Sequence, residues 1–515
     1  MTSPHFSRPA GNRRRLLLLI QAVLVSVVAA VGIGFAEFPA NLDNAVFPVC
    51  VLVSGISVWN FCSWRLLGQE WFGPYGLFLI SATLFNGGQA FLEILDLNLN
   101  GVLDGRYAPE LTVKALYMVA LGLAALHLGA IGASRKPAVP GRLRPRFSDD
   151  GRDNACRAVG WSCIWISAIP SVLVLRDMVV TAASRGYSGL YGRPDEEILS
   201  SAIRFPAGFL VTGIMFLAAG SRKQRHSLAL AAVLMAVYSG IVMYSGERRL
   251  GAPVLLAFAW LYHSRIRRLS RTTLAIALSA GIGLLGLLTI VAEVRNAQGS
   301  WLESVQKARA TSRAAQNPFV GAVSEMGGTG AGRVADTINL IPAVRPFDYG
   351  AGYGYGFVSL LPNLGWAVHP ATVHGSYSEW LTRTLDPRID AHGGGFGYSF
   401  IAEPFANFGW YGVAPLLFLT GYLFVRMCDW ATLTDDPAKY AFVAAALVPL
   451  LFFPRDETER LFRPLLYYCF LPYAAARLWT KRAPSKSREA RSQRIALTSI
   501  QPATPTRGSL AKSRT

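Results

Sequence analysis

Long apolar runs without charged residues recur along the chain. The runs 16–35, 46–64, 75–92 and 274–291 contain no Asp, Glu, Lys or Arg. Each reaches the roughly 17–25 residues that a helix needs to cross about 30 Å of hydrocarbon. A helix satisfies its own backbone hydrogen bonds, so such runs can lie in lipid. The pattern predicts an all-α polytopic membrane protein with about 12 transmembrane helices. We expect these helices near 16–35, 46–64, 72–92, 111–131, 156–175, 205–220, 228–244, 251–262, 273–293, 410–427, 440–454 and 464–477.

The composition of the chain agrees with this interpretation. Its 515 residues include 16% charged residues, against about 25% in soluble globular proteins, and the mean hydropathy is +0.33. Arg13, Arg14 and Arg15 precede the first apolar run as they would in a signal peptide, and a weak small-residue cleavage site lies near Gly34. Because many further spans follow, we expect this first helix to stay uncleaved.

The net charge of +19 raises the question of nucleic-acid binding, but the distribution of the basic residues argues against it. Most Arg and Lys lie in alternate connections between spans, for example Arg222–Arg225 and Arg265–Arg268. This bias is typical of the cytoplasmic side of a membrane and predicts cytoplasmic N and C termini. The basic tail is rich in Ser, Pro and Thr, so we expect it to be disordered. The predicted cytoplasmic segments are 1–15, 132–155, 221–227, 263–272, 428–439 and 478–515.

One predicted connection is far longer than the others. The chain divides into an N-terminal membrane domain of about nine helices (1–293), a large extracytoplasmic loop (294–409), about three C-terminal membrane helices (410–477) and the tail (478–515). A loop of that length is usually functional. Its Gly-rich runs permit close backbone approach, but no Gly-Lys-Ser/Thr follows them, so they do not form a P-loop.

The chain lacks the signature of a metal site or of a duplicated transporter. None of its six cysteines has metal-ligand spacing, and His369 and His374 have no nearby Cys or Glu-x-x-His pattern. We therefore expect no metal and no cofactor, and cysteines that pack in the core. The sequence has no internal repeat of fixed period, which gives no support to a transporter built from two related halves.

Charged residues gather at the predicted extracytoplasmic ends of the spans, while the span centres are nearly free of charge. Charge at membrane depth is costly and usually faces a cavity or a partner. An ion or proton pathway would place some of these residues at mid-bilayer, so the asymmetry favours an enzyme over a transporter. The residues concerned are Glu93, Arg176, Glu247, Arg248, Arg249, Glu293, Arg295, Glu403 and Arg455.

The arginines are candidate ligands for an anionic substrate. Arginine presents a planar fork of donors that matches phosphate oxygens, and a lipid diphosphate is the anion expected at this depth. Arg248 and Arg249 lie in a short turn between two spans; the alternative is a solvated hairpin tip. Four further candidates, which an exposed amphipathic helix would also carry, are Arg295, Arg309, Arg313 and Arg333.

Two residues of the long loop are candidates for proton transfer. Glu403 ends a mostly apolar stretch before the tenth span, where desolvation would raise the pKa of its carboxyl and suit it to general acid–base work. It could equally serve only as the ion-pair partner of an arginine. His392 is the second candidate, although a loop histidine is more often a solvated side chain. Aromatic rings, Tyr398 among them, are dense here and suit either stacking on sugars or a membrane-interface belt.

Three segments carry a further signal. The first is Ser245–Gly251 (SGERRLG) at the head of a span. The second runs from Glu325–Thr329 (EMGGT) to Phe347–Tyr353 (FDYGAGY) and Leu360–Pro362, and the third is Gly394–Gly409 (GGFGYSFIAEPFANFG). In order and spacing they resemble motifs of the bacterial O-antigen polysaccharide polymerases, Wzy-type enzymes related to the O-antigen ligases. Glu247 before two arginines departs from the motif and leaves open which arginine takes the family's role.

The resemblance implies a GT-C-like fold in the bacterial inner membrane and an inverting glycosyl transfer without nucleotide sugar, metal or cofactor. A glycan on undecaprenyl diphosphate would move onto a new lipid-linked repeat unit, with a chain-length regulator and a flippase as protein partners. Arg248 or Arg249 would neutralise the leaving diphosphate, and Glu403 or His392 would accept the proton. Residues implied in binding diphosphate or glycan are Arg295, Arg309, Arg313, Arg333, Tyr398 and Asn407.

Three other functions compete with polymerisation. An O-antigen ligase would use the same donor and a lipid A-core acceptor. A flippase or exporter of lipid-linked oligosaccharide would need charged residues at mid-membrane positions, which the spans lack. A non-catalytic scaffold of a polysaccharide assembly complex would tolerate substitution of the arginines.

Overall fold

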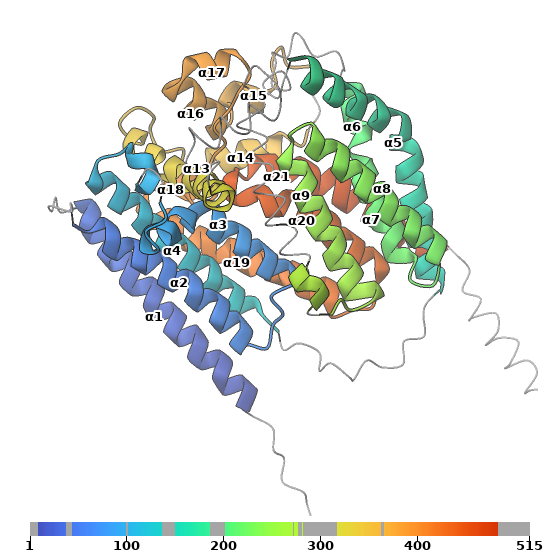
Figure 1. Ribbon diagram of the computed structural model, residues 1–515, viewed down its shortest axis with the longest axis horizontal. Helices are drawn as coiled ribbons and strands as arrows, with labels where there is room; N and C mark the ends of the chain where they lie inside the picture. The colour runs from blue at the N-terminus through green and yellow to red at the C-terminus, as the bar shows by residue number, and fades with distance from the viewer. Residues whose placement is uncertain are drawn as a thin grey trace, which may run out of the picture.

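The computed structural model describes residues 9–37, 44–98, 101–135, 150–185, 201–270, 272–276, 281, 317–361 and 365–482. In this part of the chain every regular element is a helix and no strand occurs, which confirms the predicted all-α class (Figure 1). The longer helices are α1 (Pro9–Glu37), α2 (Val46–Leu66), α3 (Pro74–Ile94), α4 (Pro109–Ala133), α5 (Asp150–Arg185), α7 (Phe209–Gly220), α8 (Arg225–Tyr244), α9 (Arg248–Leu261), α13 (Pro318–Leu340), α19 (Trp410–Thr432), α20 (Pro437–Phe452) and α22 (Leu471–Arg482). The shorter helices are α6 (Ser201–Ala207), α14 (Ala351–Val358), α15 (Pro370–His374), α16 (Tyr377–Leu385), α17 (Pro387–Ala391), α18 (Ala402–Phe408) and α21 (Glu459–Arg463), with the turn η5 (Phe453–Arg455) and the π-helix η6 (Pro464–Phe470).

Nine helical stretches of the described chain are long and apolar enough to cross a membrane, which makes this a multi-pass membrane protein. Of the other three predicted spans, 251–262 lies in α9, which has 14 residues and ends at Leu261, and in the first residue of the π-helix η4 (Tyr262–Ile266). Of the predicted span 273–293, only 273–276 and 281 are among the described residues. The last, 464–477, begins as η6 and continues as α22. The count of 12 therefore stays a prediction. The nine stretches are Asn12–Gly34, Val46–Leu66, Pro74–Ile94, Pro109–Ala133, Asp150–Ser184, Ala202–Gly220, Arg225–Tyr244, Trp410–Thr432 and Pro437–Arg455.

Several of these helices begin at residues that favour a helix start. Pro74 and Pro109 occupy the first position of α3 and α4, where the missing N–H is not needed and the fixed φ suits a helix. Asp436 caps α20, because its Oδ1 accepts the backbone N–H of Ala438 at 3.1 Å. Helix starts are thus fixed locally, whereas their packing depends on distant residues.

The first group of helices packs around α4, which is in contact with α1, α2, α3, α13 and α19. Glycines let α4 and α19 touch backbone to backbone. A Cβ atom on Gly129 would overlap the carbonyl oxygen of Phe418, and one on Gly421 would overlap that of Leu126. Small residues at such crossings give membrane helices the close packing that stabilises them in lipid.

Helix α13 lies within the predicted long loop, but it packs into this first group. It crosses α3 at Gly327, where an added Cβ would lie 2.8 Å from the Cα of Gly88. Gln89 strengthens the crossing, since its Nε2 donates to the carbonyl oxygen of Ser324 at 3.0 Å. The motif glycines near 327 therefore serve a helix crossing, and α13 also contacts α18.

The second group consists of α5, α7, α8, α9, α20 and α22. Gly160 of α5 and Gly213 of α7 face each other, so that a Cβ on Gly213 would lie 2.9 Å from the Cβ of Cys163. Helix α20 joins the two groups, since it packs against α3 and α19 as well as α7 and α9. In Figure 1 helices α15, α16 and α17 lie toward one end of the molecule, and the start of α1 lies toward the other.

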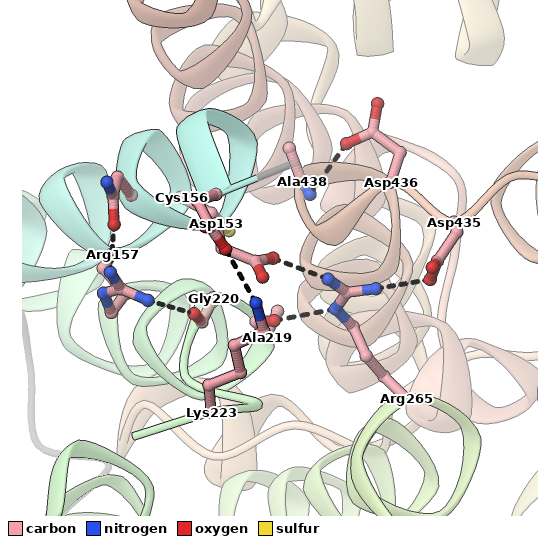
Figure 2. Close-up of polar contacts among 12 residues, drawn as sticks. Asp153, Cys156, Arg157, Ala219, Gly220, Lys223, Arg265, Asp435, Asp436 and Ala438 are labelled. Atoms are coloured by element: carbon pink, nitrogen blue, oxygen red, sulfur yellow. Dashed lines mark hydrogen bonds and ion pairs between the residues drawn. The ribbon is translucent and has the colours of Figure 1, made fainter. Parts of the chain in front are cut away.

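A buried arginine, Arg265, links the segments at the start of α5, the end of α7, the end of α9 and the start of α20 by hydrogen bonds. Arg265 follows α9, and its side chain is 4% exposed. Its Nη2 donates to Asp153 at 2.7 Å, its Nη1 to Asp435 at 2.8 Å and its Nε to the carbonyl oxygen of Ala219 at 2.7 Å (Figure 2). These partners begin α5, end α7 and precede α20. Predicted cytoplasmic segments thus meet at one end of the bundle.

Gly129 provides a test of the α4–α19 crossing. We expect Gly129→Ala to destabilise the protein by about 1–3 kcal/mol, because overpacking forces the two backbones apart. Gly132→Ala on the same helix is the matched control, since its nearest neighbour would be a Phe418 ring atom at 3.9 Å, an ordinary contact. Thermal unfolding in detergent, followed by size-exclusion, measures both. Equal melting temperatures for the two variants would contradict the close-contact interpretation.

Arg265 provides a test of the buried ion pairs. We expect Arg265→Gln to cost about 3–5 kcal/mol of stability, because it leaves the buried Asp153 without its cation. Arg268→Gln is the control, since Arg268 is 71% exposed and lies 3.9 Å from Glu70, and an exposed pair contributes only about 0–1 kcal/mol. The same unfolding assay compares them, and a loss in Arg268→Gln as large as that in Arg265→Gln would count against the buried cluster.

Candidate functional site

Glu403 lies in α18 and is 2% exposed. Its Oε2 accepts two hydrogen bonds from Thr458, one from the backbone N–H at 2.9 Å and one from the hydroxyl at 2.7 Å. Its Oε1 accepts no hydrogen bond from the described residues. The structure thus holds the carboxyl by one oxygen, and it leaves the other oxygen available to a substrate.

The surroundings of Glu403 favour its protonated form. Burial raises the pKa of its carboxyl to about 8; the hydrogen bonds from Thr458 oppose this, and the nearby charges of Glu457 and Asp456 add to it. A carboxyl whose pKa lies near neutrality can exchange a proton under working conditions. The predicted desolvation of Glu403 is therefore present, and no arginine forms an ion pair with it among the described residues.

A second buried carboxyl lies beside the first. Glu457 is 1% exposed, and its Oε2 accepts the backbone N–H of Tyr377 at 2.7 Å while its Oε1 accepts that of Ser378 at 3.3 Å. Arg460 Nε lies 3.6 Å from the same Oε1. Burial raises the pKa of Glu457 to about 7, and Arg460 opposes the shift. Glu457 thus binds the first turn of α16.

Asp348 is the centre of a third cluster, in the turn before α14. Its Oδ2 accepts hydrogen bonds from Arg345 at 2.8 Å and from the Tyr377 hydroxyl at 2.7 Å, and it lies 3.3 Å from His374 Nε2. Burial alone would raise the pKa of Asp348, but the bonds from His374, Tyr377 and Arg345 lower it below its ordinary value. The Arg345 guanidinium also lies over the rings of Tyr377 and Trp380, at 4.9 and 5.2 Å from their centroids.

Among the candidate arginines, Arg333 has a side chain that lies within the described part of the structure. It lies on α13, and its side chain is 9% exposed. Its Nη2 is 3.1 Å from Asp336 Oδ2, and the guanidinium lies 4.8 Å from the ring centroid of Phe396. Its Nε and Nη1 have no hydrogen-bond partner within the described chain. Buried charged donors without acceptors cost several kcal/mol, so this edge of Arg333 is suited to an incoming anion.

Tyr398 and Asn407 both form hydrogen bonds to other residues of the site. Tyr398 is fully buried, its hydroxyl accepts the Thr337 hydroxyl at 3.1 Å, and its ring stacks on Tyr377 at 5.1 Å. Asn407 Oδ1 accepts the backbone N–H of Gly350 at 3.0 Å, and its Nδ2 donates to the carbonyl oxygen of Glu403 at 3.0 Å. Their predicted contacts with glycan stay predictions.

The structure does not bring all the predicted residues together. His392 is exposed after α17, and its Nδ1 lies 2.7 Å from the carbonyl oxygen of Arg388, whereas Glu403 is buried in α18. Arg248 and Arg249 begin α9, and their side chains lie outside the described part of the structure. Three further predicted residues are wholly outside the described chain: Arg295, Arg309 and Arg313.

Several polar residues of the site were not predicted from sequence. Glu457 and Thr458 lie in the run 455–460 (RDETER), whose charges are typical of a solvated turn. The one signal for burial is the apolar sequence on both sides, 446–454 and 461–462. Asp348 lies within the quoted Phe347–Tyr353 motif and Arg345 lies two residues before it, but neither charge was singled out. Within the described residues no three His, Cys, Asp or Glu side chains lie close enough to hold a metal ion.

Comparison with known proteins gives a family match. The sequence model of a family described as O-antigen polysaccharide polymerase Wzy matches residues 17–482, which is nearly the whole chain. No curated protein and no solved structure matches the chain significantly. The match includes α13 to α18 and the run 455–460, and so all the clusters described above.

The protonation of Glu403 predicts how stability depends on pH. The folded carboxyl, with a pKa of about 8 against an ordinary value of 4.5, holds its proton to higher pH than the unfolded chain does. Its contribution to stability is therefore full below about pH 4.5 and is lost as pH rises through 8. We expect melting temperature to fall between pH 5 and 8.5 more steeply in wild type than in Glu403→Gln. Parallel curves would contradict the assignment; Glu110→Gln, at an exposed site, controls for charge.

Proposed function

The chain belongs to the O-antigen polysaccharide polymerase Wzy family, and from this premise we propose that it polymerises undecaprenyl-diphosphate-linked oligosaccharide repeat units by inverting glycosyl transfer at the periplasmic face of the inner membrane. Members of this family act on lipid-linked repeat units as glycosyltransferases. The observation that carries the proposal is that one end of the bundle holds a buried carboxyl, that of Glu403, and the guanidinium of Arg333, whose Nε and Nη1 have no partner among the described residues.

The proposed reaction makes one bond and breaks one. A hydroxyl oxygen at the non-reducing end of the acceptor repeat attacks the anomeric carbon of the donor glycan from the side opposite the diphosphate. The bond between that carbon and the diphosphate oxygen breaks, and the electron pair leaves with the lipid diphosphate. The hydroxyl proton passes to a carboxylate. The protein thus has two tasks, which are to accept a proton and to stabilise the negative charge of the leaving group.

Glu403 is the better proton acceptor of the two residues predicted for this role. Its Oε2 is fixed by Thr458 and its Oε1 accepts no bond from the described residues, so a substrate hydroxyl can approach a carboxylate of defined orientation. With a pKa of about 8, the carboxylate is a stronger base than an exposed glutamate. His392 is exposed and its Nδ1 faces a backbone carbonyl oxygen, so its geometry gives this role less support.

In this proposal the guanidinium of Arg333 supplies a positive charge that stabilises the leaving diphosphate. Its Nε and Nη1 lack acceptors among the described residues, and Phe396 covers the guanidinium face. An anion bound there would gain charge-assisted hydrogen bonds in a site shielded from water, where such bonds are strong. Arg248 or Arg249, with Arg295, Arg309 and Arg313, belong to the proposal as further diphosphate ligands on the strength of the sequence motifs alone.

The proposal is tested first in the host. Deleting the gene and separating the surface polysaccharide on a gel should collapse the polymer ladder to a single repeat on the lipid core, and wild-type protein should restore it. Arg248→Ala or Arg249→Ala should fail to do so. Lipid-linked polymer with no glycan on the core would instead identify a ligase, and repeats trapped on the cytoplasmic face would identify a flippase.

Matched substitutions then test the two assigned residues. We expect Glu403→Gln to slow polymerisation by about 10²–10⁴-fold, the range of general-base catalysis, and His392→Gln to leave it unchanged. Arg333→Gln should cost about 10²–10³-fold, against no loss in Arg383→Gln, whose side chain is 72% exposed. Polymer formed by purified protein in proteoliposomes, normalised to folded protein, gives the rates. An inactive His392→Gln beside an active Glu403→Gln would reverse the assignment of the base.

A further inference from the structure

Glu457 accounts for the hydrogen bonds of the first turn of α16, together with Ser376. A helix leaves its first backbone N–H groups without partners inside the helix. In α16 the first two, of Tyr377 and Ser378, donate to the Glu457 carboxylate at 2.7 and 3.3 Å. The third, of Glu379, donates to the Ser376 hydroxyl at 3.1 Å. The contact between the Glu457 carboxylate and α16 is favourable for two reasons. The N-terminus of a helix attracts negative charge, and the backbone amides are buried together with their acceptor.

The next residue of the chain makes the contact with Glu403. Thr458 gives both its backbone N–H and its hydroxyl to Glu403 Oε2. Two consecutive residues between η5 and α21 therefore hold two different elements, α16 through Glu457 and α18 through Thr458. A shift of Glu457 moves Thr458 with it, because the residues share a planar peptide bond.

Helix α16 in turn connects this dipeptide to the aromatic part of the site. Tyr377 stacks on Tyr398, and its hydroxyl donates to Asp348. Trp380, one turn further on, lies under the guanidinium of Arg345. The position of α16 thus sets the positions of Asp348 and Arg345, whereas Glu457 sets the position of α16.

We propose that Glu457 is a positioning residue for the transfer reaction: it clamps the N-terminus of α16 against the Thr458–Glu403 contact, so that the docking of α16 and the orientation of Glu403 depend on one another. The inference rests on the proposed function in taking Glu403 as the group that receives the proton. Both oxygens of the Glu457 carboxyl already accept backbone N–H groups of α16, so in this proposal Glu457 acts through α16 and Thr458.

Glu457 also acts on Glu403 through its charge. The ionised Glu457 carboxylate opposes ionisation of Glu403, and the backbone amides of α16 and Arg460 offset that charge. A variant that removes the charge of Glu457 should therefore let Glu403 lose its proton at lower pH. Other titratable or charged groups that face the two carboxyls are Asp456, Glu459, Arg460, Tyr353, Tyr377 and Tyr398.

Hydrogen exchange of the full-length protein in nanodiscs tests the clamp without reference to activity. In Glu457→Ala we expect the backbone amides at the start of α16 to exchange at least tenfold faster, with exchange in α4 and α19 unchanged. Glu459→Gln is the matched control, because it removes a carboxylate two residues away that accepts none of the bonds above. An α16 that keeps its protection in Glu457→Ala would overturn the clamp.

Polymer formation in proteoliposomes, supplied with lipid-diphosphate-linked repeat units extracted from host membranes, tests the consequence for the reaction. Glu457→Ala should slow polymerisation roughly 10²-fold, the effect of misplacing a catalytic group by about 1 Å. Thr458→Val, which removes one of the two bonds to Glu403, should also slow it, and Thr458→Ser, which keeps the hydroxyl, should restore it. Equal rates in Thr458→Val and wild type would contradict the role of Thr458.

The pH profile separates positioning from a general loss of structure. In Glu457→Gln the acid limb of the rate profile should move down by roughly one pH unit, whereas Glu110→Gln, at an exposed site on α4, should leave it in place. A lower rate at every pH with no shift would show that Glu457 is only structural and overturn the proposal. Failure of wild type to make any polymer would instead overturn the proposed function, while the α16 amides still report on the clamp.

Discussion

A charge buried among apolar helices must be matched by a partner, because its desolvation costs more than one ordinary hydrogen bond returns. The fold meets this constraint at both ends of α20. At one end Arg265 lies between Asp153 and Asp435. At the other, Glu457 takes the amides of a helix start, with Arg460 beside it. Arg333 meets the constraint in part, since its Nη2 lies 3.1 Å from Asp336 Oδ2 while its Nε and Nη1 are unmatched within the described chain.

Helix packing determines where these charges lie. Helix α20 has 16 residues, a length of about 24 Å at 1.5 Å per residue, and so separates the Arg265 cluster from the Glu403 cluster by most of a membrane's hydrocarbon thickness. Asn86 of α3 supports the far end, donating to the carbonyl oxygen of Pro454 at 3.2 Å and accepting the Ser399 hydroxyl at 2.8 Å. The segments that hold Glu457 and Glu403 thus rest on the same buried amide, which makes the site part of the bundle rather than of a loop above it.

The features that depend on local sequence pattern could be predicted from the sequence alone. Apolar length predicts the nine stretches that are long enough to cross a membrane, and an apolar context predicts the burial of Glu403. It could not predict Glu457, because charges at 455–460 are typical of solvent until a distant helix start supplies the amides that bury one of them. Nor could it distinguish Glu403 from His392, since both lie in Gly-rich sequence and only tertiary packing separates a buried carboxyl from an exposed ring. Hydropathy alone does not give the number of spans, because it does not reveal that α9 has only 14 residues or that the last predicted span begins as the π-helix η6.

The polar residues inside the spans also bear on the choice between an enzyme and a transporter. Gln21 donates to the carbonyl oxygen of Ala124 at 2.9 Å and accepts the Trp59 indole N–H at 2.7 Å, and His127 lies within bonding distance of Ser63 and Tyr75. These groups join α1 to α4 by bonds that are already made, so they have no capacity left for a passing ion or sugar. Within the described residues, the end of the bundle that holds Glu403 and Arg333 has a carboxylate oxygen and two guanidinium nitrogens without hydrogen-bond partners. Since these two charged side chains lie at one end of the bundle, their position favours a reaction at that end over passage through the bundle.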